Sequence, residues 1–144
     1  ILSRAVDQAK PPADLASVNL DVFTPPEVLM VRGDAFILRA AITNLLENAI
    51  DFSPPGSTVE IVLYHIDGKA IVEIGDRGPG VPDYATEKVF ERFYSLRHHS
   101  AGRKGTGLGL TLVKEAAELH GGSVSLEPRE GGGTVARLII PVVP

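Results

Sequence analysis

Two glycine-rich runs constrain the folds that this sequence can adopt. The first, residues 76–80 (Asp-Arg-Gly-Pro-Gly), directly follows a β-rich run, and the second, residues 105–110 (Gly-Thr-Gly-Leu-Gly-Leu), opens a helical one. Glycine lets the backbone turn tightly and approach a ligand closely. A loop at a strand end and a loop at a helix start together predict an α/β protein that holds a ligand between its loops.

The other segments read as short alternating elements. Helices are predicted over residues 2–10, 36–50 and 108–120, with one helical turn around 87–92. Strands are predicted over residues 19–23, 29–32, 58–66, 69–75, 123–127 and 134–141. Because helices alternate with strands but hairpins also occur, we expect a two-layer α/β (α+β) sandwich. Its sheet should be mixed, largely antiparallel, and covered on one face by helices.

Turn and cap residues mark several of these ends. Pro11 and Pro12 are expected to end the first helix. Asp34 is a good N-cap for the second helix, and Gly121 is placed to cap the C-terminus of the third. Residues 67–68 (Asp-Gly) predict a β-hairpin.

Length and composition indicate one globular domain. The chain has 144 residues, of which 44% are hydrophobic and 22% charged, so it can form a single core. It contains no cysteine, which excludes disulfides and thiolate chemistry, and its net charge of −4 argues against nucleic-acid binding. We expect one domain over residues 1–144, with a connecting segment at 1–14, and a monomer in isolation.

Asn44 and Asn48 lie four residues apart on the second predicted helix, so both project from one face. The donors and acceptors of side-chain amides on a largely apolar helix need partners, which are either neighbouring backbone groups or a ligand. In the second reading, Asn48 gives its amide oxygen to Mg²⁺, which takes few protein ligands and completes its shell with phosphate oxygens and water.

Asp76 is expected to face the ligand from the end of the 69–75 strand. An adenine N6 amino group donates to a carboxylate, whereas guanine presents an acceptor there, so this acid would select ATP over GTP. Such a bond contributes about 1.5–3 kcal/mol. Gly78 and Gly80 would let the backbone approach the base. The alternative is an ordinary aspartate in a strand-end turn.

The second glycine run is suited to phosphate binding, since backbone N–H groups at a helix start form an anion site. A Rossmann pattern would need glycine where Leu110 stands, and a P-loop would need Gly-Lys-Ser/Thr, which does not occur. The candidate phosphate-binding residues are Gly105, Thr106, Gly107, Leu108 and Gly109.

Basic side chains gather between the two glycine runs. Residues 88–104 hold five basic residues against the single acid Glu91. Residues 83–104 are therefore expected to form a cationic lid over a triphosphate, with a solvated loop as the alternative.

With these motifs in order, the chain resembles the catalytic and ATP-binding domain of sensor histidine kinases, in the Bergerat (GHKL) ATPase superfamily. Residues 44–49 (Asn-Leu-Leu-Glu-Asn-Ala) resemble the N box and residues 90–94 (Phe-Glu-Arg-Phe-Tyr) the F box. Residues 76–80 and 105–110 resemble the two glycine boxes. The sequences around positions 50 and 95 are similar to those of carbon-source-responsive kinases of the CreC type.

The resemblance implies a Bergerat fold that binds ATP with Mg²⁺. It implies γ-phosphoryl transfer to a histidine on a separate dimerisation domain, with a response regulator downstream. The domain would be cytoplasmic and its parent membrane-anchored. The roles implied are Asp76 at the adenine amino group, Gly78 and Gly80 beside the base, Asn48 at the metal, Gly105 and Gly107 at the phosphates, Phe90 at the lid, and Arg92 or Arg97 at the γ-phosphate.

Several positions depart from the family pattern. Residues 51–52 (Asp-Phe) stand where many kinases have Lys-Tyr, and Ser95 replaces a basic residue. Asn44 stands where hydrolytic relatives carry a general-base glutamate, so efficient hydrolysis is not expected. None of the four histidines has a phospho-acceptor setting, which places the acceptor on another domain.

The alternatives to a histidine kinase domain are a nucleotide-binding regulatory module without transfer, or a GHKL ATPase or anti-sigma serine kinase.

Overall fold

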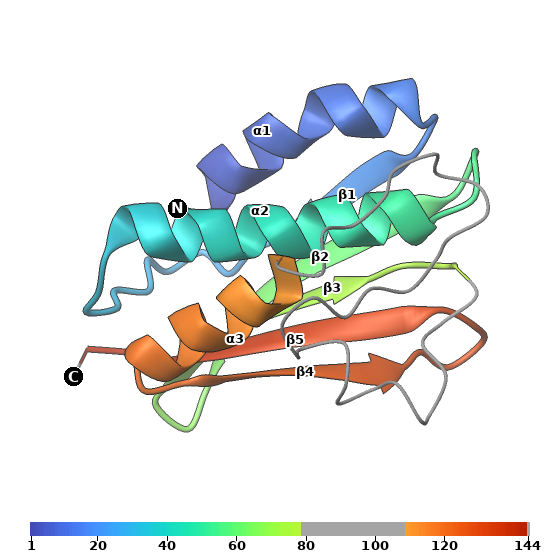
Figure 1. Ribbon diagram of the computed structural model, residues 1–144. Helices are drawn as coiled ribbons and strands as arrows, with labels where there is room; N and C mark the ends of the chain where they lie inside the picture. The colour runs from blue at the N-terminus through green and yellow to red at the C-terminus, as the bar shows by residue number, and fades with distance from the viewer. Residues whose placement is uncertain (79–108, 144) are drawn as a thin grey trace.

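Three helices lie over one face of a five-stranded sheet in the computed structural model, which describes residues 1–78 and 109–143 (Figure 1). The helices are α1 (Leu2–Leu15), α2 (Ala35–Phe52) and α3 (Gly109–Leu119). The strands are β1 (Asn19–Phe23), β2 (Thr58–Ile66), β3 (Lys69–Gly75), β4 (Ser123–Pro128) and β5 (Thr134–Pro141). This arrangement confirms the expected two-layer sandwich.

The sheet is mixed, with the strand order β1-β2-β3-β5-β4. β1 runs parallel to β2, and the other three neighbouring pairs are antiparallel. The central strands align so that Ile74 pairs with Ile61 on one side and with Ala136 on the other. The next pairs along, Glu60 with Gly75 and Gly75 with Val135, present the opposite face, because side chains alternate along a strand.

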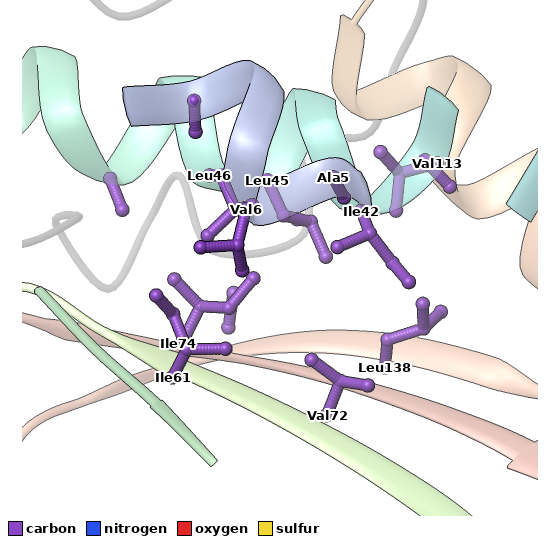
Figure 2. Packing of buried hydrophobic residues seen from close by; sticks show 14 of the residues in the cluster. Ala5, Val6, Ile42, Leu45, Leu46, Ile61, Val72, Ile74, Val113 and Leu138 are labelled. Carbon is purple, nitrogen blue, oxygen red and sulfur yellow. The ribbon is translucent and has the colours of Figure 1, made fainter. Parts of the chain in front are cut away.

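The core lies between this sheet and the helices (Figure 2). Leu45 and Leu46 of α2 are at most 1% exposed and face the strand residues Ile61, Ile74 and Leu138, which are equally buried. α2 therefore lies close above the centre of the sheet, and the ends of β3 and β5 are held beside it.

Several local predictions are confirmed. The Asp34 side chain caps α2, since its Oδ1 accepts from Ile37 N–H at 3.1 Å. Gly121 ends α3 with φ of 73°, and Gly122 N–H donates to Ala117 O at 2.8 Å, which closes the helix end. The hairpin at 67–68 and the bounds of β2, β3 and β5 also match the prediction.

The expected end of the first helix was wrong. α1 continues through Pro11 and Pro12 to Leu15, although each proline removes a helical N–H donor. Ala9 and Ala13 on either side of the prolines are both buried in the core cluster. Packing across the prolines therefore maintains the helix to Leu15.

The strand predicted at 29–32 is also absent from the described sheet. Met30 accepts one backbone hydrogen bond, from Val143 N–H at 2.8 Å, but no ladder forms there. Met30 is 63% exposed, while Val31 packs against the core cluster. The helical turn predicted around 87–92 lies outside the described residues.

Candidate functional site

Asp76 lies at the junction of two strands, one residue beyond the end of β3, and is only 6% exposed. Its Oδ1 accepts hydrogen bonds from Gly78 N–H at 2.9 Å and from Thr134 N–H at 3.3 Å. Its own backbone N–H donates to Thr134 O at 2.9 Å. The first residue of β5 therefore holds both the backbone and the side chain of Asp76.

The carboxylate of Asp76 is electrostatically costly to keep charged. Burial raises the pKa of Asp76 above its ordinary value, and the hydrogen bonds from the Gly78 and Thr134 N–H groups act in the opposite direction. Both of these bonds go to Oδ1. Within residues 1–78 and 109–143, Oδ2 accepts no hydrogen bond. Oδ1 is thus fixed as an acceptor, while Oδ2 has no partner among these residues.

The described ends of the two glycine runs, Gly78 and Gly109, lie against α2. At its C-terminal end, a Cβ atom added to Gly78 would lie 2.2 Å from Phe52 O, so this close approach requires glycine. Nearer its middle, Asn44 Nδ2 donates to Gly109 O, at the start of α3, over a long 3.5 Å. The two contacts are about 12 Å apart along the helix, at about 1.5 Å per residue.

Asn48 lies between these two contacts. It is half-buried and one turn from both Asn44 and Phe52, so all three positions share one face of α2. The structure therefore brings together the asparagine helix, the start of the first glycine run and the end of the second. Asn44 bridges to neighbouring backbone, as the alternative reading of its amide proposed.

Several candidate residues lie outside the described part of the chain. These are Gly80, Phe90, Arg92, Arg97, Gly105, Thr106, Gly107 and Leu108, together with the whole of the expected lid at 83–104.

Sequence reasoning missed Thr134. It is 7% exposed and contacts Asp76 through both of its backbone polar groups. The signal available in the sequence was a third glycine run, residues 131–133, directly before it. Gly133 has φ of +103°, and a Cβ atom there would lie 2.0 Å from Asp76 O, so this glycine lets the turn approach Asp76.

The donor set fits a cation that needs few protein ligands. Across the described ranges, no three histidine or acidic side chains gather as a metal cluster. One amide oxygen at Asn48 is compatible with Mg²⁺ that completes its shell with phosphate oxygens and water. Among these same residues, no helix has the length and apolar character needed to span a bilayer.

Comparison with known proteins gives a consistent family match. The model for histidine kinase-, DNA gyrase B- and HSP90-like ATPases matches residues 33–144. The sensor protein CutS of Streptomyces coelicolor is 35% identical over 99% of this chain, and the sensor protein CreC of Escherichia coli is 36% identical over 95%. CreC is thus one of several sensor kinases that are about equally identical in sequence to this chain. The chain spans 34% of the length of CutS and 28% of CreC.

Solved structures agree with the fold. The mycobacterial sensor histidine kinase MprB superposes with a TM-score of 0.86 at 32% identity, covering 99% of this chain and 93% of that one. Full-length ShkA, solved in complex with AMPPNP, gives a TM-score of 0.82 at 25% identity and covers 99% of this chain and 29% of that one.

Proposed function

Because the chain belongs to the histidine kinase-, DNA gyrase B- and HSP90-like ATPase family, as a sensor histidine kinase catalytic domain, we propose that it binds ATP with Mg²⁺ along α2. It transfers the γ-phosphoryl group to a histidine on a separate dimerisation domain. The observation that carries this proposal is the buried Asp76 carboxylate, held through Oδ1 beside the asparagine face of α2.

At the base end, Asp76 accepts a hydrogen bond from the adenine N6 amino group. Its bonds to Gly78 and Thr134 N–H orient the carboxylate before the ligand arrives, so binding does not have to order it. Gly78 and Gly80 border the base. The bound nucleotide of ShkA, an ATP analogue on a similar fold, supports this choice of ligand.

At the phosphate end, Asn48 holds Mg²⁺ and the glycine run 105–109 receives the phosphates. When bound, the cation neutralises charge on the phosphate oxygens. Asn48 is one turn from Asn44, whose side chain contacts Gly109 at the end of this run. Arg92 or Arg97 supplies the contact to the γ-phosphate.

The site favours transfer over hydrolysis. In transfer, the bond between the γ-phosphorus and the ADP oxygen breaks, a bond to an imidazole nitrogen forms, and the imidazole loses its proton. Asn44 is a neutral amide that donates to Gly109 O, so it cannot take a proton from water. The partners proposed are the dimerisation domain of the same kinase and a downstream response regulator, on the cytoplasmic side of a membrane-anchored parent.

Mixing the chain with the dimerisation and phosphotransfer fragment of its kinase and γ-labelled ATP tests the proposal. The expected result is label on a histidine of that fragment, stable to alkali and labile to acid, and reduced about tenfold or more with Asp76→Asn at ATP concentrations below the Kd. Steady ATP turnover by the chain alone, without transfer, would instead indicate an ATPase. ATP binding without transfer or turnover would indicate a regulatory module.

A further inference from the structure

Arg129 reaches the backbone of Asp76 from the opposite side of the sheet. It lies in the turn between β4 and β5, and its Nη1 donates to Asp76 O at 3.1 Å. Its Nη2 forms an ion pair with the Glu60 carboxylate on β2. The strand order β2-β3-β5-β4 means that this one side chain crosses from the β4 end of the sheet to β2.

The path of the Arg129 side chain across the sheet depends on the absence of a side chain at Gly75. Glu60 and Gly75 are direct partners across β2 and β3 and present the face that the helices leave uncovered. A Cβ atom on Gly75 would lie 3.2 Å from Arg129 Cζ, so the guanidinium packs directly on this residue. The Arg129 side chain is only 13% exposed, so it is fixed by packing as well as by its polar contacts.

These contacts complete the restraint of Asp76. Its N–H is held by Thr134 O, its Oδ1 by two N–H groups, and its carbonyl by Arg129. β3 ends at Gly75, so no strand ladder fixes the peptide group that follows Asp76. Rotation of that peptide would carry Gly78 N–H away from Asp76 Oδ1 and release the carboxylate, and the Arg129 contact opposes this rotation.

We propose that Arg129, held by Glu60, is a positioning residue that aims the Asp76 carboxylate and so determines how strongly the site selects a base with an exocyclic amino group. The inference rests on the proposed function, because it assumes that Asp76 receives this amino group. Arginine suits the task, since its planar fork can bond the carbonyl and the carboxylate together, which a lysine ammonium does less well.

The same face of the sheet offers a matched control. Arg137 of β5 also bridges two acids, with Nε at 2.8 Å from Glu73 and Nη1 at 2.9 Å from Glu127. Its described contacts do not include Asp76. Arg137→Met therefore removes a comparable ion-paired guanidinium from this face without touching the backbone behind the site.

The test is calorimetric titration of the 144-residue chain with ATP and with purine riboside triphosphate, which lacks the N6 amino group. Arg129→Met is expected to lower ATP affinity about five- to tenfold, a change within the range of coupling between contacting residues. Affinity for the analogue should stay unchanged. Arg129→Lys should lose less ATP affinity than Arg129→Met does. Arg137→Met should preserve the ratio of the ATP affinity to the analogue affinity. In an Asp76→Asn background, Arg129→Met should have no further effect.

If Arg129→Met leaves the ratio of the ATP affinity to the analogue affinity unchanged, the inference is overturned, while the proposed function stays intact. Near-ultraviolet circular dichroism shows whether Arg129→Met folds. If it does not, the same titrations are made with Arg129→Lys, and a ratio of ATP to analogue affinity equal to that of wild type overturns the inference. If Asp76→Asn alone leaves ATP affinity unchanged, the proposed function fails, and the inference falls with it.

Discussion

Thr134 and Asp76 are joined by two hydrogen bonds, from Asp76 N–H to Thr134 O at 2.9 Å and from Thr134 N–H to Asp76 Oδ1 at 3.3 Å. They lie 58 positions apart in the chain. The first bond extends the pairing of β3 with β5 by one residue, and the second replaces a ladder bond with a side-chain bond. The carboxylate is therefore oriented by the sheet itself.

The turn before Thr134 gives a direct prediction. Gly132 and Gly133 both have positive φ, so alanine at either position costs about 1–3 kcal/mol in backbone strain. Only at Gly133 would the new Cβ meet Asp76 O, at 2.0 Å, whereas Gly132 has open space. Gly133→Ala should destabilise the chain more in urea unfolding and weaken ATP binding, and Gly132→Ala should retain wild-type affinity. Equal affinity of the two variants for ATP would contradict this.

Removing the charge of Asp76 should affect stability and binding in opposite directions. Burial raises the folded-state pKa of Asp76, so the folded state binds its proton more tightly than the unfolded state does. The resulting stability is present below the ordinary pKa and is lost as pH rises through the folded-state pKa. Asp76→Asn should therefore gain stability relative to wild type across that interval, measured by urea unfolding at a series of pH values. A constant difference at all pH values would show that the carboxyl group has an ordinary pKa.

ATP affinity should depend on the same proton. A protonated Asp76 is a weaker acceptor for the adenine amino group, so affinity should fall as pH drops below the raised pKa of Asp76. Binding near this pH should release a proton, visible in calorimetry as a dependence of the heat on buffer ionisation enthalpy. Titration of the ATP phosphates also contributes, and Asp76→Asn serves as the control because only the phosphate contribution remains. An identical pH profile in the variant would argue against the contact.

The metal assignment predicts a change confined to Mg²⁺-dependent binding. Asn48→Ala should remove most of the gain in ATP affinity that Mg²⁺ produces, about tenfold or more for one strong polar contact. Affinity without Mg²⁺ should change little. Asn48→Asp, which keeps an oxygen at the same place on α2, should retain the gain. If Asn48→Ala binds Mg²⁺-ATP as wild type does, another group holds the metal.

Local sequence signals predicted the elements on which the site is built. The aspartate cap of α2, the glycine end of α3 and the 67–68 hairpin depend on neighbouring residues, and all three agree with the structure. The structure also brings the asparagine helix against Gly78 and Gly109, the described ends of the two glycine runs.

Features that depend on distant packing could not be predicted in this way. Pro11 and Pro12 have a strong local tendency to end a helix, but burial of Ala9 and Ala13 outweighs it. Thr134 and Arg129 contact Asp76 from 58 and 53 positions away, and the glycine run 131–133 between them predicts a tight turn without indicating that partner. Only the strand order β3-β5-β4 brings them together.

Calorimetric titration of the chain with ATP and GTP, in the presence of Mg²⁺, tests the central claim most directly. Wild type should bind ATP more tightly than GTP, because Asp76 accepts a hydrogen bond from adenine and meets an acceptor on guanine. Asp76→Asn should lose about tenfold or more in ATP affinity. It should also narrow the difference between the nucleotides, since an amide can donate to guanine. Equal affinities of wild type for both nucleotides, or an Asp76→Asn variant that binds ATP as wild type does, would contradict the account.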